Sequence, residues 1–425
     1  MNGDFTTAAV LVAIGVFLLA YAFVFMDADG DLDFDQSMEY EDYLPLSGSV
    51  QGTQGPIEIV TISGVQYVHA IGTGNAKVIM SDSEDQRIRI VKAHADLILM
   101  NGQSNAAYYR HDRPLSQAEK DVTPVPEIGT TFYYGYSDGM PTFAGDEIDT
   151  CKIYDFVDRS GGVRVGDKGP ELCITWHQTT GKKAIYVSLG IPGRAISYWQ
   201  PPSSLCWDKN KLMMTSVNAA LADTGFTIDR TVVFWAQGES DYSHNTGYDH
   251  YIQTFKEMHQ AAPSAWGRAI DHWYLIEGRT AKMGWVNGAF EDIASTMQDV
   301  DVCVRASLID SFEIDNGLME SDNLHYSQMG DNAVANCAAR TALGAQGSSP
   351  IYLVEARMTA TQGEQATPPS RATAYTTTAG MLSVRVSWDA VDTSAAGVVT
   401  VPGSLQSDYD LLPGVAPLLI LEVTP

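Results

Sequence analysis

The sequence predicts an α/β fold: a parallel sheet covered by helices on both faces, with a small β domain on either side and a hydrophobic helix at the N-terminus. Three observations predict it. Between residues 95 and 347, short apolar runs alternate with longer stretches of helical pattern. Residues 50–94 and 348–425 consist of short strand-like runs separated by turn residues. Residues 1–26 include a continuous apolar segment, long enough for a bilayer-spanning helix.

The length and the charge of the chain limit its class. With 425 residues, the chain is expected to form two or three domains rather than one. Its formal net charge of -26 argues against nucleic acid as a partner, because a strongly acidic chain does not neutralise phosphates. The same acidity argues against docking on anionic lipid head groups.

The N-terminal segment is expected to be an uncleaved anchor. Neither Lys nor Arg precedes Lys77, and no small-residue cleavage site follows the apolar run, so a signal peptide is the weaker interpretation. The acidic residues 27–49 are expected to form a linker outside the cell. The alternative is that residues 1–26 pack with copies of themselves in a surface filament. The expected location is therefore the cell surface, by membrane anchoring with the ectodomain outward, or an extracellular filament.

The central domain, residues 95–347, is expected to present its site at one edge of the sheet. Ligands bind beyond the carboxyl ends of the strands in such sheets. Strands are predicted at 96–100, 184–189, 231–236, 273–276 and 300–305, and helices near 170–180, 209–222, 246–261, 284–298 and 327–343.

The first polar cluster after a predicted strand is Gly102-Gln103-Ser104-Asn105, which directly follows an apolar run. Gly102 permits a tight backbone path. Ser104 is the candidate nucleophile, and we expect it at a helix N-terminus, whose free N–H groups suit a developing oxyanion. The alternative is that the four residues are only a turn between a strand and a helix.

The second candidate pair is Asp322 and His325, three residues apart. In a helical turn this spacing brings the two side chains together. Asp322 would then accept the imidazole N–H and direct the other ring nitrogen toward Ser104, as in a Ser-His-Asp triad. The alternative is a capping Asp and a surface His.

The oxyanion donors are expected to be the backbone N–H of Ser104, the backbone N–H of Gly193 and the side-chain amide of Gln237, which follows another apolar run. Arg194 is either a salt-bridging surface residue or a substrate contact. Glu239 is assigned with Arg194 to substrate binding, although a loop-orienting role fits it as well. The mechanism requires no metal and no cofactor.

Taken together, these blocks resemble the SGNH hydrolases of the sialate O-acetylesterase and acetylxylan esterase type. The resemblance covers roughly residues 95–345 and rests on Gly102–Asn105, on Gly190–Trp199, on Gln237–Asp241 and on Asp322–His325. It implies a flavodoxin-like three-layer core and a carbohydrate O-acetylesterase that forms an acyl-enzyme. It also implies Ser104, Asp322 and His325 as the triad, with Ser104, Gly193 and Gln237 at the oxyanion. Pro192 and Arg194 depart from the family's second block, which affects the expected shape of the pocket. Gly169-Pro170-Glu171 also resembles the family's segment before its first covering helix.

The C-terminal residues 386–392 and 397–403 resemble a bacterial Ig-like domain. Such domains usually act as spacers or adhesive modules. The leading hypothesis is therefore a surface-anchored serine esterase that acts on acetylated glycans. The alternative is a structural subunit of a surface filament or adhesion assembly that displays the SGNH domain. A lectin-like domain without activity is disfavoured, because all the catalytic residue types are present.

The chain has five cysteines, so at least one is free or pairs between chains. No CxxC spacing occurs, so structural zinc is not expected. Cys151 and Cys173 flank a Gly-rich loop and are a candidate disulfide pair outside the cell. Cys303 and Cys337 are expected to be small buried apolar residues.

Overall fold

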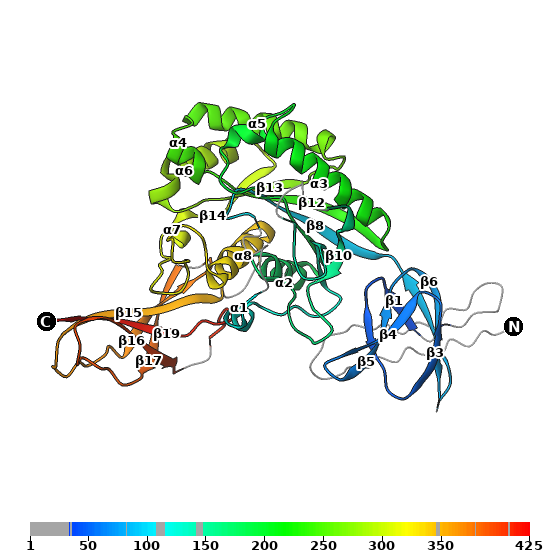
Figure 1. Ribbon diagram of the computed structural model, residues 1–425, viewed down its shortest axis with the longest axis horizontal. Coiled ribbons are helices and arrows are strands. Elements are labelled where there is room, and N and C mark those ends of the chain that lie inside the picture. The colour runs from blue at the N-terminus through cyan, green and yellow to red at the C-terminus, as the bar shows by residue number, and fades with distance from the viewer. Residues whose placement is uncertain are drawn as a thin grey trace.

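The computed structural model describes residues 34–425 except 35, 82, 108–114, 142–147, 346–348, 379 and 407–408. The predicted N-terminal helix lies outside the described residues. Figure 1 shows a central domain of helices and strands with two β modules below it, one near each end of the chain. Within the described part, no helix is long and apolar enough to cross a membrane.

The centre of the molecule is a seven-stranded sheet with the order β10-β9-β11-β8-β12-β13-β14. All neighbouring strands are parallel except β9 and β10. The five strands from β11 to β14 follow the chain order 2-1-3-4-5, the flavodoxin-like order. The predicted parallel sheet is therefore confirmed. The strands are β8 (Ala93–Gly102), β9 (Thr131–Gly135), β10 (Lys152–Asp155), β11 (Lys183–Ser188), β12 (Phe226–Ala236), β13 (His272–Ile276) and β14 (Val300–Val304).

Helices cover both faces of this sheet (Figure 1). One face packs against α3 (Leu205–Ala222), α5 (Tyr248–Ala265) and α6 (Thr280–Thr296), and the other packs against α2 (Gly169–Thr180) and α8 (Gln328–Leu343). Successive strand residues alternate between the two cores: Leu97 and Leu99 face the first, Ile98 and Met100 the second. Six tryptophans are almost completely buried in these layers: Trp176, Trp199, Trp207, Trp235, Trp266 and Trp273.

Shorter elements connect these layers, and the sequence analysis did not predict them. They are α1 (Gln117–Val122), α4 (Glu239–His244), α7 (Ala306–Ile309) and two 3-10 turns, η1 (Ile148–Thr150) and η2 (Ile196–Trp199). The strands β9 and β10 were also not predicted.

The N-terminal β module begins at Gln36, so the expectation of a linker over residues 27–49 is wrong for its second half. Residues 36–49 contribute two strands and dock on the central domain. The ring of Tyr40 packs edge-on against Phe226 with centroids 4.9 Å apart, and Lys183 Nζ lies 2.8 Å from Asp42 Oδ1. The strands are β1 (Gln36–Glu39), β2 (Tyr43–Pro45), β3 (Val50–Gln54), β4 (Ile57–Ile62), β5 (Val65–Ala70), β6 (Gly74–Met80) and β7 (Gln86–Val91).

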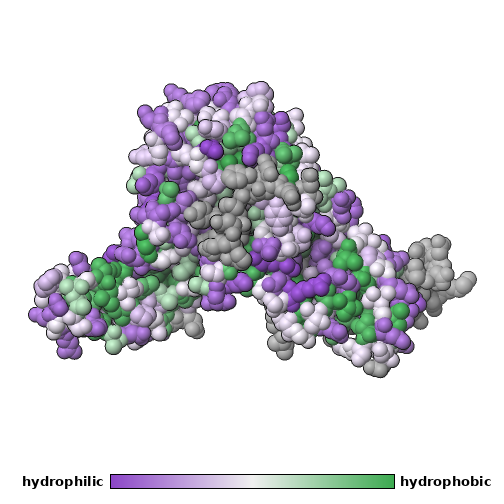
Figure 2. Space-filling view, viewed as in Figure 1, coloured by the Kyte–Doolittle hydropathy of each residue, from purple (hydrophilic) through white to green (hydrophobic). Residues whose placement is uncertain are grey.

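The C-terminal module is a closed five-stranded barrel. It is fastened to the central domain by Tyr352, which is buried in the core beneath α8 and lies 2.8 Å from Ser311 Oγ through its hydroxyl. Figure 2 shows hydrophobic surface over this module, and the exposed Met381, Leu382 and Val398 belong to its strands. The strands are β15 (Ile351–Thr361), β16 (Arg371–Thr376), β17 (Gly380–Trp388), β18 (Gly397–Leu405) and β19 (Pro417–Thr424).

All five cysteines are buried, and the structure contains no disulfide between them. The candidate pair Cys151 and Cys173 is excluded by position. Cys151 lies in the core of the α3 face and Cys173 in the core of the α2 face, so the sheet separates them. Burial raises the pKa of the Cys173 thiol well above its usual range. Cys303 and Cys337 are buried, as expected.

Candidate active site

The candidate site lies where β8 and β12 end. These strands are parallel neighbours, and Gly102 pairs with Ala236, so Ser104 and Gln237 leave the sheet side by side. Gly102 has a φ of +133°, and a Cβ at this position would lie 2.0 Å from the carbonyl oxygen of Ala236. Because that neighbour is backbone in a central strand, it has little freedom to move. Only glycine fits where the two strands approach each other.

Ser104 lies in a turn and not at the start of a helix. The N–H groups of Ala106 and Ala107 both donate to the carbonyl oxygen of Gln103, at 2.8 and 2.9 Å, and close the turn. Within the described residues, the next helix begins only at Gln117. Ser104 therefore lies in a turn and not at the positive end of a helix dipole, which differs from the expectation. Ser104 is 8% exposed.

Gln103 connects the Ser104 turn to the segment after β12. Its Oε1 accepts from the backbone N–H of Ser240 at 3.2 Å and from that of Gly238 at 3.4 Å. Free N–H groups at a helix start require such partners. The side chain of Gln103 thus caps α4 and holds the two polar clusters together.

Asp322 and His325 form the predicted pair. Asp322 Oδ2 lies 2.5 Å from His325 Nδ1, and Asp322 Oδ1 accepts from the backbone N–H groups of Leu324 and His325 at 2.9 and 3.0 Å. Desolvation raises the pKa of Asp322, but the hydrogen bonds from His325 and Leu324 outweigh it and the pKa is lowered. The carboxylate therefore stays ionised opposite the imidazole. The side chain of His325 is 15% exposed and that of Asp322 44%.

Asn105 brings the Asp322–His325 loop to the Ser104 turn. Its Nδ2 donates to the carbonyl oxygen of Leu324 at 3.2 Å and to Glu239 Oε1 at 2.8 Å. One amide group next to the candidate nucleophile therefore contacts both of the other polar segments. The sequence analysis did not assign this role to Asn105. The direct neighbourhood of Asn105 and Ser104 was the signal that could have indicated it.

The segment from Gly190 to Trp199 lies against the same turn. The N–H of Ile191 donates to the carbonyl oxygen of Gly102 at 2.8 Å, and a Cβ on Gly190 would lie 2.5 Å from the backbone nitrogen of Ala107. Gly193, by contrast, is exposed with a φ of +66°, and a Cβ there would meet nothing within 4 Å. Gly193 therefore presents its backbone to open space beside the turn.

Gln237 is completely buried, and its amide group is used within the protein. Its Nε2 donates to the carbonyl oxygen of Arg194 at 3.0 Å and to the Asp241 carboxylate, and its Oε1 accepts from the Tyr251 hydroxyl at 2.7 Å. Both amide hydrogens thus have acceptors. This geometry differs from the expectation that the Gln237 amide faces an oxyanion. The physical reason is the carboxylate of Asp241 four residues later, which attracts the amide inward.

Glu239 and Arg194 are the candidate substrate-binding residues, and their surroundings differ. Glu239 is 9% exposed, and its Oε2 has no hydrogen-bond partner among the residues that the structure describes. Burial raises the pKa of Glu239 against the effects of Asn105 and His325. Its contacts support the loop-orienting role. The guanidinium of Arg194 lies 5.3 Å from the ring centre of the exposed Tyr198. Among the described residues no carboxylate forms an ion pair with Arg194, so its salt-bridging alternative is not realised there.

The chain is similar to three solved structures. One is NanS, with 14% identity, coverage of 60% of this chain and 98% of that chain, and a TM-score of 0.40. Another is a carbohydrate acetylesterase from Xanthomonas citri, with 12% identity, coverage of 92% of this chain and 96% of that chain, and a TM-score of 0.40. The third is the acetylxylan esterase Axe2 from Geobacillus stearothermophilus, with 11% identity, coverage of 60% of this chain and 96% of that chain, and a TM-score of 0.34. Residues 354–409 match the bacterial Ig-like domain (group 4). The C-terminal barrel contains an Ig-like sequence. No curated protein matches the sequence significantly.

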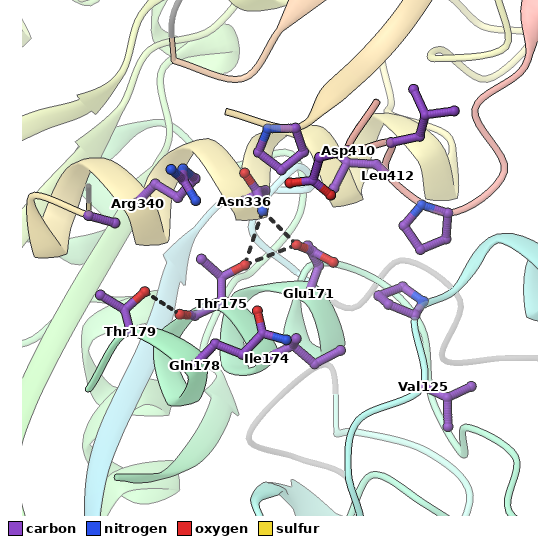
Figure 3. Close-up of a pocket in the computed structure, with 15 residues that line it drawn as sticks. Val125, Glu171, Ile174, Thr175, Gln178, Thr179, Asn336, Arg340, Asp410 and Leu412 are labelled. Carbon is purple, nitrogen blue, oxygen red and sulfur yellow. Dashed lines mark hydrogen bonds between the residues drawn. The ribbon is translucent and has the colours of Figure 1, made fainter. Parts of the chain in front are cut away.

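A separate cavity of about 670 Å³ lies between α2, α8 and the barrel (Figure 3). Glu171, from the Gly-Pro-Glu segment, is buried at its wall, and its Oε1 accepts from Asn336 Nδ2 at 2.8 Å and from Thr175 Oγ1 at 2.9 Å. Burial, assisted by the charge of Asp410, raises the pKa of Glu171 to about 7. None of the candidate site residues is among the described residues that line this cavity. Glu171 therefore links the two helices of one layer and takes no part in the candidate site.

Proposed function

We propose that the central domain is a serine esterase with Ser104 as nucleophile, His325 as general base and Asp322 as the residue that orients the imidazole. The observation that carries this proposal is the 2.5 Å contact between Asp322 Oδ2 and His325 Nδ1, in a loop that Asn105 joins to the Ser104 turn. A carboxylate on Nδ1 leaves Nε2 as the acceptor for the serine proton.

The proposed reaction has two stages. Ser104 Oγ attacks the ester carbonyl while His325 Nε2 takes its proton, and the imidazolium then returns this proton to the departing alcohol. The acyl group remains on Ser104. Water attacks the acyl-enzyme with the same histidine as base, which releases the acid and restores the serine.

We assign the oxyanion to the backbone N–H groups of Ser104 and Gly193. The Gly193 backbone borders open space, as an approaching substrate requires. Gln237 is proposed as a positioning residue, because its amide holds the carbonyl of Arg194, the residue after Gly193. Arg194 remains a proposed substrate contact.

The proposed substrate is an O-acetylated carbohydrate, on the strength of the resemblance of residues 95–345 to carbohydrate esterases. A place at the cell surface through residues 1–26 belongs to the same proposal. The filament alternative has no observation in its favour among the described residues.

The test is ester hydrolysis by a chain that begins at residue 27, with p-nitrophenyl acetate and a panel of acetylated glycans as substrates. The Ser104→Ala variant is expected to lose activity by about 10³-fold or more, the usual loss for a nucleophile. Its melting temperature should stay near that of the parent, because only one hydroxyl is removed. Full activity in Ser104→Ala would overturn the triad, and release of acetate from none of the glycans would overturn the substrate class.

A further inference from the structure

The loop that carries Asp322 and His325 has a second anchor besides Asn105. Arg279 stands at the N-cap of α6, three residues after the end of β13, so it reaches the site from the same edge of the sheet as Ser104 and Gln237. Its Nη1 donates to Asn323 Oδ1 at 2.6 Å, and its Nη2 donates to the carbonyl oxygen of Phe312 at 2.6 Å. One guanidinium thus spans two segments of the polypeptide.

Asn323 is well placed to transmit this contact. It is the residue directly after Asp322, and its φ of +53° lies in the left-handed region. Its backbone N–H donates to the carbonyl oxygen of Glu320 at 3.0 Å, and the N–H of Glu320 donates to the carbonyl of His325 at 2.9 Å. The side chain of Asn323 is therefore attached to a short closed turn that contains both members of the pair.

The Asp322–His325 pair needs contacts from outside its own loop, because the Asp322 side chain is exposed to solvent. The Asp322 side chain is 44% exposed, and the bonds between Asp322, Leu324 and His325 are all internal to the loop. Internal bonds keep the shape of the loop but do not fix its place relative to Ser104. Asn105 and Arg279 supply bonds that leave the loop, one to the backbone of Leu324 and one to the side chain of Asn323.

We infer that Arg279 is a positioning residue for the Asp322–His325 pair, acting through Asn323. The inference rests on the proposed function and adds a residue that the sequence analysis did not single out. Arg suits this place because its planar guanidinium can donate to two separate acceptors and stays charged at every working pH. A lysine has a single nitrogen and cannot reproduce both bonds in this geometry.

The neighbouring Lys282 provides a matched control. Lys282 and Arg279 line the same small hollow beside Asn105 and Glu239, but the Lys282 side chain makes no hydrogen bond or ion pair within the described residues. Lys282→Met removes a positive charge from this place without removing a bond to the loop. It separates the general effect of charge from the specific contact with Asn323.

The experiment compares kcat and KM for p-nitrophenyl acetate in Arg279→Lys, Arg279→Met, Asn323→Ala and the double variant Arg279→Met/Asn323→Ala. We expect kcat to fall about tenfold in Arg279→Met and in Asn323→Ala, with KM changed less than twofold, because misplacing a base affects turnover and not uniform binding. The double variant should be no worse than the poorer single variant, since both changes break the same contact. Arg279→Lys should remain impaired, and Lys282→Met should be as active as the parent.

Three results would overturn the inference: unchanged kinetics in Arg279→Met, losses that multiply in the double variant, or a raised KM with unchanged kcat, which would make Arg279 a substrate contact. Melting temperatures show whether loss of the Phe312 contact unfolds the chain, and kcat is compared only at temperatures where every variant is folded. Ser104→Ala keeps the two proposals distinguishable. An active Ser104→Ala variant contradicts the esterase mechanism itself, whereas an unaffected Arg279→Met variant contradicts only the role of Arg279.

Discussion

At the scale of single residues, the two glycines near Ser104 have opposite requirements. A Cβ at Gly102 would lie 2.0 Å from a backbone oxygen of the neighbouring strand, whereas a Cβ at Gly193 would meet no atom within 4 Å. Both have positive φ, but only Gly102 is also closed in by backbone. Substitution by alanine therefore creates a steric clash at Gly102, whereas at Gly193 it creates only an unfavourable backbone conformation.

We predict that Gly102→Ala destabilises the fold far more than Gly193→Ala. The first forces β8 and β12 apart and should cost at least about 3 kcal/mol, whereas the second bears only the strain of a left-handed alanine, about 1–2 kcal/mol. Urea denaturation of both variants measures the difference. Equal losses would show that the strand contact at Gly102 relaxes without cost.

The Asp322–His325 pair could be predicted from the sequence because the contact is local: the partners are three positions apart in the chain. The orientation of the Gln237 amide could not be predicted in this way. Its acceptors include the carbonyl of Arg194, which is 43 residues away in the sequence. A polar residue at a strand end indicates where a site lies, but the direction of its hydrogen bonds depends on the folded neighbours.

At the scale of elements, Gln237 joins the end of β12 to the Gly190–Trp199 segment and to α4. Gln237→Ala removes a donor from the buried Asp241 carboxylate and from the half-buried Arg194 carbonyl. We predict a loss of about 1–3 kcal/mol in the free energy of unfolding, because a buried carboxylate and a half-buried carbonyl each lose one donor, together with a lower kcat. Thermal denaturation and kinetics are measured on the same variant. A fall in kcat of about 10²–10³ with no loss of stability would instead restore the role of direct oxyanion donor.

Elements with a strong pattern were predicted well, and short edge elements were not. The strands β8, β11, β12, β13 and β14 are buried apolar runs. Helices α2, α3, α5 and α6 separate them and α8 follows the last, so the parallel core could be predicted. The strands β9 and β10 have four or five residues at the edge of the sheet, too few for a period to stand out. The strands β1 and β2 were hidden in an acidic segment, because their buried residues Met38 and Tyr43 stand between several carboxylates in the sequence.

At the scale of the whole molecule, hydrogen bonds and buried side chains fasten the barrel to the central domain. Thr377 Oγ1 of the barrel donates to Asn336 Oδ1 of α8 at 2.9 Å. Asn336 Nδ2 in turn donates to Glu171 of α2 at 2.8 Å (Figure 3). These hydrogen bonds connect the barrel to α8, and α8 to α2. The protonation of Glu171 therefore affects the junction as well as the helix pair.

This junction predicts an unusual pH dependence of stability. The pKa of Glu171 is about 7 in the folded protein and 4.5 in a free side chain. Between these values the folded chain holds a proton that the unfolded chain releases, so a rise in pH favours unfolding. The contribution is complete below about pH 4.5 and is lost as the pH rises through 7, in total about 3 kcal/mol.

Glu171→Gln isolates this contribution, because glutamine keeps the shape and does not titrate. We expect the melting temperature of the parent to fall relative to that of Glu171→Gln between pH 5 and pH 8. The buried Asp155, whose pKa burial also raises to about 7, is present in both proteins and cancels in the comparison. Parallel curves for the two proteins over this range would contradict the prediction.

The uneven distribution of tryptophan gives the molecule a built-in optical reporter. Of eight tryptophans, only Trp388 lies in the barrel, none lies in the N-terminal module, and six are enclosed between the sheet and its helices. Tryptophan fluorescence therefore reports the exposure of the central domain to water. Far-ultraviolet circular dichroism instead reports the secondary structure of the central domain and both β modules together. Denaturation curves from the two signals should separate if either β module melts on its own.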